Sequence, residues 1–206
     1  MNNQHDAPGF VSVSEAIPDV LLDVRYYSTY NFVGERIDGY EAPLVLLTRE
    51  AAAALALVNA DLRRQGLRLV LYDGYRPQRA VDHFVRWAES SDISMRPVFY
   101  PEVDKADLFT RGFIARRSGH SRGSTIDLTL LDERSGSLLD MGGPFDFFGE
   151  LSHPDCPHIT PAQHANRWLL REAMMKHGFK PLSTEWWHFT LEKEPYPDTY
   201  FDFPIR

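Results

Sequence analysis

Stretches with the hydrophobic spacing of helices alternate along this chain with short apolar runs typical of strands. Thr48 can cap a helix that continues to about Gln65, with Gly66 as its stop. The segment Thr160-Pro161-Ala162-Gln163 predicts a capping box with proline at the first helical position, opening a helix that stops at Gly178. The other expected helical segments are a helix from Pro77 to about Ala88 and a short turn near Asp104–Arg111.

Three apolar runs have the composition of β-strands, namely Leu67–Tyr72, Ile126–Leu130 and Glu185–Leu191. In the second run Asp127 and Thr129 share one face, and the aliphatic side chains that alternate with them fill the other. Helices interleaved with hairpin-like strands favour an α+β fold, with helices packed on a mostly antiparallel central sheet.

Length and composition indicate one domain over residues 1–206. The 206 residues are 43% hydrophobic, which is enough for a substantial core. A formal net charge of −7 without a stripe of Lys or Arg argues against nucleic acid or an anionic membrane surface as a partner. No apolar run approaches the roughly 20 residues of a membrane helix, and the first residues lack a secretory pattern. We therefore expect a cytoplasmic protein, with a homo-oligomer left open.

The single cysteine, Cys156, cannot form an internal disulfide, which is consistent with a reducing compartment. It lies within His153-Pro154-Asp155-Cys156-Pro157-His158, a candidate metal cluster. Two prolines stiffen this segment, and a loop that carries histidines is usually a polar loop, so we rank it below the pattern described next. The histidines of the expected helices, interpreted as surface or packing residues, are His83, His164 and His177.

The strongest chemical pattern is the segment Ser118–Asp127, which contains His120, followed by Glu185-Trp186-Trp187-His188. Two histidines and one aspartate form the three-ligand set of a catalytic zinc, and the remaining glutamate is a base for water bound to the metal. A continuous helix would separate residues 120 and 127 by about 10 Å along its axis, too far for one ion. The chain must therefore turn near Gly123, which can adopt a positive φ, before it enters the strand that holds Asp127.

The position of Glu185 is the most difficult to reconcile with a zinc site. A regular strand would place Glu185 and His188 on opposite faces, so the zinc interpretation requires a bend that turns Glu185 toward the site at the strand entrance. The structural alternative makes His188 a core histidine and Glu185 a surface charge. The presence of His120 and Asp127 favours the metal interpretation.

The pattern Ser-x-His-x-x-Gly-x-x-x-Asp followed by Glu-x-x-His resembles the LAS-type zinc peptidases. This group includes D-Ala-D-Ala carboxypeptidases, D-Ala-D-Ala dipeptidases and the Hedgehog amino-terminal domain. Longer stretches over most of the chain are similar to the vancomycin-resistance type of dipeptidase in peptidase family M15. They are Tyr72–Pro77, His120–Gly123, Ile126–Leu130, Met141-Gly142, Phe145–Phe147, Glu185–His188 and Tyr200–Pro204. Thr125 departs from that pattern, in which Ala is expected.

The resemblance implies a metal site and a catalytic pair. The ligands of one zinc ion per chain would be His120, Asp127 and His188, with water at the fourth position. Glu185 would accept a proton from that water and later protonate the leaving amine. Arg76 would stabilise the oxyanion.

The resemblance also implies a substrate-binding set. Asp146 would bind the ammonium of the substrate, with Tyr26 and Ser118 nearby. For Asp146 the alternative is a turn-capping role after Gly142-Gly143-Pro144.

The implied activity is hydrolysis of the dipeptide D-Ala-D-Ala to two D-Ala, in glycopeptide antibiotic resistance or in recycling of cell-wall fragments. One alternative is a D,D- or L,D-carboxypeptidase acting on longer peptidoglycan peptides. Another is a non-catalytic, zinc-bearing binding module. Glu185 and Arg76 together favour the enzyme, because a structural zinc needs neither a base nor an oxyanion partner.

Overall fold

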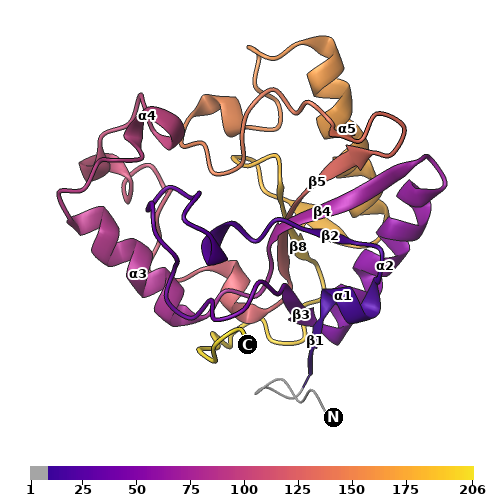
Figure 1. The fold of residues 1–206 in the computed structure, drawn as a ribbon, viewed down its shortest axis with the longest axis horizontal. Helices are drawn as coiled ribbons and strands as arrows, with labels where there is room; N and C mark the ends of the chain where they lie inside the picture. The colour runs from indigo at the N-terminus through magenta and orange to yellow at the C-terminus, as the bar shows by residue number, and fades with distance from the viewer. Residues whose placement is uncertain (1–8) are drawn as a thin grey trace.

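The computed structural model describes residues 9–206, and its centre is a mixed sheet with helices packed against it (Figure 1). Strands β2, β4, β5, β8 and β7 lie side by side in that order, and β6 pairs with β5. Only the β2–β4 pair in this sheet is parallel among the described residues, and β1 and β3 form a separate antiparallel pair. The expected α+β fold is confirmed.

The strands are β1 (Phe10–Ser12), β2 (Leu21–Leu22), β3 (Leu46–Thr48), β4 (Leu67–Asp73), β5 (Thr125–Asp132), β6 (Ser137–Leu138), β7 (Phe179–Pro181) and β8 (His188–Leu191). The α-helices are α1 (Val13–Ala16), α2 (Arg49–Arg63), α3 (Gln78–Glu89), α4 (Arg96–Phe99) and α5 (Pro161–Lys176). Short 3-10 turns are η1 (Arg25–Tyr27), η2 (Lys105–Asp107), η3 (Gly119–Arg122) and η4 (Glu150–Ser152).

Two of the helices have the caps that the sequence predicts. The Thr48 hydroxyl accepts a hydrogen bond from the backbone N–H of Ala51 at the start of α2. Thr160 and Gln163 form the complete capping box of α5, with side chain and backbone bonded in both directions. Pro77 lies at the N-cap of α3, one position before the first helical residue. The short helix expected near Asp104–Arg111 is only the 3-10 turn η2.

The last predicted strand is shorter than expected. We expected it to begin at Glu185, whereas β8 begins at His188. The backbone before β8 forms hydrogen bonds outside the sheet. The N–H of Trp186 donates to the carbonyl of Ser152, and the N–H of His188 faces the carbonyl of Glu185. These bonds form a turn over the residues that we expected to begin the strand.

Both faces of β5 are covered, although its side chains alternate in character. Ile126, Leu128 and Leu130 are fully buried on one face. Asp127 and Thr129, on the opposite face, are also almost completely buried. A buried carboxylate must be compensated by hydrogen bonds or by a cation, so Asp127 marks the polar interior of the molecule.

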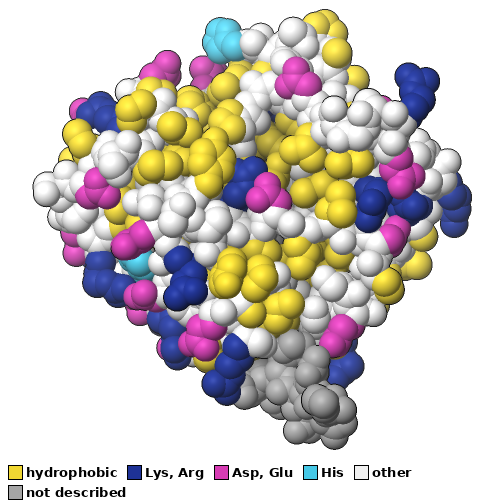
Figure 2. All heavy atoms as spheres, viewed as in Figure 1, with side chains coloured by type: hydrophobic (Ala, Val, Ile, Leu, Met, Phe, Trp, Pro, Cys, Tyr) yellow, Lys and Arg dark blue, Asp and Glu magenta, His cyan; other side chains and the backbone are white. Residues whose placement is uncertain are grey.

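On the surface shown in Figure 2, hydrophobic side chains gather around the centre of the face, and acidic and basic side chains are interspersed around them. In the described part of the chain, no helix combines the length and the apolar character needed to cross a membrane.

The turn between His120 and β5 is packed against the amino-terminal strand pair. Gly123 has a φ of +83°, and its carbonyl accepts a hydrogen bond from the N–H of Thr48. A Cβ at this position would overlap the ring of Phe10 and would lie 3.2 Å from the Thr48 methyl group. Glycine is therefore required here for its conformation and for its size.

We predict that Gly123→Ala lowers the free energy of unfolding by at least about 3 kcal/mol, because left-handed strain and overpacking add. Gly66→Ala is the matched control, with a φ of +73° and no neighbouring atom within 4 Å of the added methyl. Its loss should be about 1 kcal/mol, from strain alone. Urea denaturation with a chelator present measures both variants, and equal losses would contradict the packing argument.

Candidate metal centre and active site

His120 is presented by the turn η3 with a defined orientation. The Ser118 hydroxyl caps this turn by accepting a hydrogen bond from the N–H of His120. The imidazole Nδ1 lies 2.7 Å from the carbonyl oxygen of Gly74. Because a carbonyl only accepts, Nδ1 carries the proton, and Nε2 is left with a free lone pair.

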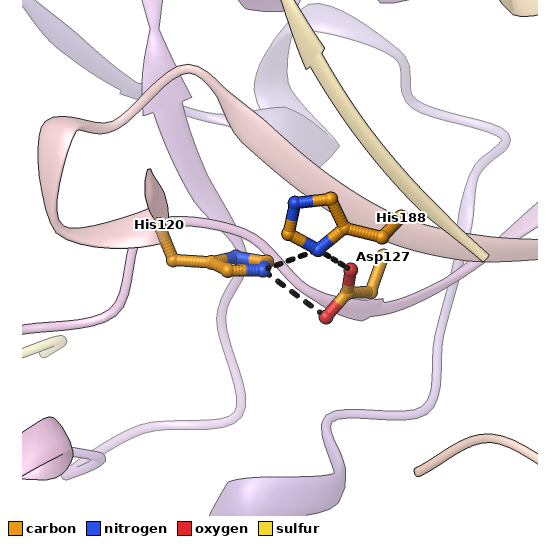
Figure 3. Close-up of side chains that lie close together, drawn as sticks. All are labelled: His120, Asp127 and His188. Carbon is orange, nitrogen blue, oxygen red and sulfur yellow. Dashed lines mark hydrogen bonds and ion pairs between the residues drawn. The ribbon is translucent and has the colours of Figure 1, made fainter. Parts of the chain in front are cut away.

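Asp127 and His188 are cross-strand partners in the antiparallel pairing of β5 and β8. His120 Nε2 lies 3.2 Å from Asp127 Oδ2 and 3.3 Å from His188 Nδ1. His188 Nδ1 lies 3.1 Å from Asp127 Oδ1. Figure 3 shows the three side chains converging on one point from η3, β5 and β8.

This donor set fits a zinc ion. A tetrahedral ion with bonds of about 2.0–2.2 Å holds its ligand atoms roughly 3.3–3.6 Å apart, close to the separations observed here. The buried Oδ1 of Asp127 has no aligned hydrogen bond. Within residues 9–206, the only group of three His, Cys, Asp or Glu side chains close enough to share an ion is His120, Asp127 and His188.

The electrostatics of the set also favour a cation. Burial raises the pKa of Asp127, but the adjacent His120 and His188 outweigh it and hold that pKa below its usual range. Burial lowers the pKa of His188, and the adjacent carboxylates of Asp127 and Glu185 reverse the effect and raise it to about 10. The two carboxylates therefore stabilise positive charge at the point where the three side chains meet.

Glu185 lies beside the cluster because of the turn that shortens β8. Its Oε2 is 3.4 Å from His188 Nδ1, and its side chain is 28% exposed. A regular strand would have pointed Glu185 to the opposite face. The bend that the sequence argument requires is therefore present, as a turn stabilised by the bond from Trp186 to Ser152.

Arg76 is fixed next to the cluster by a carboxylate that the sequence argument did not single out. Asp73, at the end of β4, accepts from Arg76 Nε at 2.9 Å and lies 2.8 Å from its Nη2. The Tyr40 hydroxyl donates to the other oxygen of Asp73 at 2.6 Å. Arg76 Nη2 also lies 3.7 Å from Asp127 Oδ2. An aspartate at the end of a mostly apolar strand was the available signal, because such a carboxylate is buried and needs a partner.

Asp146 and Tyr26 meet on another wall of the same space. The Tyr26 hydroxyl donates to Asp146 Oδ2 at 2.8 Å. Burial and the nearby Asp127 raise the pKa of Asp146 well above its usual value. Tyr26 also packs under Arg76, with the guanidinium carbon 4.9 Å from the ring centroid.

One cavity of about 280 Å³ collects these groups. Its lining includes every predicted site residue, namely Tyr26, Arg76, Ser118, His120, Asp127, Asp146, Glu185 and His188. The apolar part of the wall includes Phe32, Phe84 and Phe148. This volume lies just below the range of small-molecule pockets, about 300 to 1,000 Å³, and suits a small polar ligand.

The other histidines of residues 9–206 lie outside this cluster. In the segment from His153 to His158, Cys156 is buried and His158 is exposed beside Glu150, so the segment does not converge on an ion. His83 faces Glu35, and His177 faces Asp61.

Thr125 shares a hydrogen bond of 2.9 Å with Thr190, its cross-strand partner. The hydroxyl that departs from the family pattern is thus satisfied within the sheet.

The chain matches the sequence profile of the peptidase M15 family, described as D-ala-D-ala dipeptidase, over residues 6–206. Three proteins named D-alanyl-D-alanine dipeptidase are similar to it over most of their lengths. The Streptomyces coelicolor protein is 44% identical, covering 95% of this chain and 98% of its own. The Enterococcus faecalis protein is 43% identical, with 96% and 98% covered. The Escherichia coli protein is 38% identical, with 90% and 86% covered. This chain is therefore a peptidase, and it belongs to the peptidase M15 family.

Proposed function

We propose that this peptidase hydrolyses the dipeptide D-Ala-D-Ala to two D-Ala with one zinc ion per chain. The observation that carries the proposal is the convergence of His120, Asp127 and His188 in a small cavity that also contains Glu185 and Arg76. The names of the relatives with 38–44% identity support the substrate.

The metal would be held by His120 Nε2, His188 Nδ1 and the Asp127 carboxylate. When bound, zinc lowers the pKa of a water ligand to about 7 and polarises the carbonyl under attack. Gly74 fixes the tautomer of His120 through its carbonyl, so the ligand nitrogen faces the site before any ion arrives.

Glu185 would accept the proton of the attacking water and deliver it to the leaving amine. Its carboxylate lies at the edge of the ligand set and is partly exposed, so it can contact both water and substrate. Within residues 9–206, its ion-pair contact is the one of 3.4 Å to His188, which is longer than the contacts between Asp73 and Arg76 and leaves its oxygens available for proton transfer.

Arg76 would stabilise the negative charge that develops on the carbonyl oxygen. Its guanidinium is held in place by Asp73 and faces Asp127 at 3.7 Å, so it would lie next to a carbonyl bound at the ligand set without reorganising. A guanidinium stays charged across the working pH range.

Asp146, with Tyr26 bonded to it, would bind the ammonium of the dipeptide, and Ser118 would contact the substrate at the cavity wall. An incoming ammonium stabilises the ionised form of Asp146, whose pKa burial otherwise raises. A cavity of about 280 Å³ favours a dipeptide over the longer peptides of a carboxypeptidase.

The biological setting of the proposal is cytoplasmic, with residues 1–206 acting as one domain, alone or as a homo-oligomer. Glycopeptide resistance and recycling of wall fragments would both consume the same dipeptide.

The proposed substrate is tested with purified, zinc-loaded protein and three peptides: D-Ala-D-Ala, L-Ala-L-Ala and a pentapeptide that ends in D-Ala-D-Ala. We expect release of D-Ala from the first peptide only, with loss of activity in chelator and recovery with added zinc. Comparable cleavage of the pentapeptide would indicate a carboxypeptidase, and activity that survives metal removal would exclude a metal-dependent reaction.

Glu185→Gln should lower kcat by about 10²–10⁴-fold, because proton transfer is lost while the metal ligands remain. Zinc content measured by atomic absorption should stay near one ion per chain. His120→Ala should instead lose the ion. The control is Glu192→Gln, an exposed position of the same segment, which should keep full activity. A Glu185→Gln enzyme with normal turnover would remove Glu185 from the mechanism.

Asp146→Asn should raise KM for D-Ala-D-Ala about tenfold or more with a smaller change in kcat, because a charge-assisted hydrogen bond to the ammonium is replaced by a neutral contact. Steady-state kinetics measure both constants. Asp198→Asn, at an exposed position, is the control. An unchanged KM would restrict Asp146 to the turn-capping role.

A further inference from the structure

Asp146 has an unusual backbone conformation. Its φ is +62°, and it is the one residue other than glycine with a positive φ in the described part of the chain. A residue other than glycine is strained in this region, and the conformation persists only when its surroundings impose it. The loop of residues 141–153, which contains Asp146, must therefore be held from outside.

Arg167 on α5 holds both ends of this loop. Its Nε donates to the carbonyl of Met141 at 2.6 Å, and its Nη1 donates to the carbonyl of His153 at 2.6 Å. Its Nη2 donates to the carbonyl of Leu151 at 2.8 Å. The Arg167 residue is 3% exposed, so these are buried hydrogen bonds from a charged donor.

The bonds of Arg167 require a guanidinium. Its fork of rigid donors can reach three carbonyls in different directions at once, whereas a lysine ammonium is a point charge on a flexible stem. No ion pair of Arg167 occurs among those found in residues 9–206, so backbone carbonyls take the place of a carboxylate partner. The buried guanidinium thus holds the backbone at the two ends of the loop in one arrangement.

Two other residues of α5 also bind the chain next to this loop. Gln163 donates to the side chain of Asp140, and Asn166 donates to the Asp140 backbone carbonyl. These residues precede Arg167 by four and one positions and hold the chain where it enters the loop. At the other end of the loop, the carbonyl of Ser152 accepts the bond from Trp186, next to Glu185.

We propose that Arg167 is a positioning residue for substrate binding: its three bonds to the ends of the 141–153 loop set the place of the Asp146 carboxylate in the cavity. Arg167 does not line the cavity, so it acts through the loop backbone. The inference rests on the proposed function, since it assigns Arg167 an effect on the binding of the dipeptide ammonium.

The test is a double-mutant cycle in the full-length, zinc-loaded enzyme with D-Ala-D-Ala as substrate. The variants are Arg167→Lys, Asp146→Asn and the double variant, with Arg171→Lys as a control one helical turn away. Arg167→Gln is the second substitution at the site, in case one of the two does not fold. Thermal unfolding followed by circular dichroism is recorded first, so that kinetics are measured where each variant is folded.

We expect Arg167→Lys to raise KM by on the order of tenfold to a hundredfold with a smaller change in kcat, because a misplacement of 1 Å can cost about 10²-fold. In the Asp146→Asn background the same substitution should change KM less than threefold, since the group it positions is already altered. Arg171→Lys should leave KM unchanged.

A folded Arg167 variant with the wild-type KM would overturn the inference, even if its unfolding midpoint falls. An equal KM effect in both backgrounds would also overturn it, because Arg167 would then act independently of Asp146. If the wild-type enzyme itself does not cleave D-Ala-D-Ala, the proposed function fails, which is a separate result from an additive cycle in an active enzyme.

Discussion

The register between β5 and β8 is the constraint on which the site depends. It places Asp127 directly across from His188, so two of the three candidate ligands are fixed by backbone hydrogen bonds of the sheet. A shift of one residue would turn one of the two side chains to the other face, so Asp127 and His188 could no longer share an ion. The third ligand, His120, needs only the short turn at Gly123 and the carbonyl of Gly74 to meet them.

The charges around this point are arranged in two connected groups. At the candidate ligand set, the carboxylate of Asp127 and that of the adjacent Glu185 carry negative charge that a divalent cation can neutralise. Beside it, Asp73 neutralises Arg76 and, with Tyr40, holds the guanidinium still. Arg76 in turn contacts Asp127 and stacks on Tyr26, which is bonded to Asp146. A substitution of one of these side chains should therefore alter the positions or charges of the others, because a buried charge that loses its partner raises the free energy of the folded state.

The proposed substrate-binding side of the cavity depends on irregular structure. Asp146 lies in a loop with a left-handed residue, and Glu185 lies in a turn where a strand was expected. The two segments are joined by the bond from Trp186 to Ser152, and α5 holds the loop through Arg167. The sheet thus supplies two of the three candidate metal ligands and η3 the third, and the loops anchored on α5 and β8 supply the groups proposed to bind and protonate the substrate.

The sequence by itself determined the α+β class, the caps of α2 and α5, the need for a turn at Gly123 and the pattern that resembles the family, because these depend on local spacing and residue type. Tertiary structure decided the turn at Glu185, the partnership of Asp73 with Arg76 and the anchoring of the Asp146 loop by Arg167. The turn at Glu185 and the anchoring of the loop depend on bonds between segments that are separated in the chain. Asp73 and Arg76 are only three residues apart, but Asp73 is also held by Tyr40, 33 residues away. Periodicity carries no information on such contacts, since they exist only once the sheet has brought the segments together.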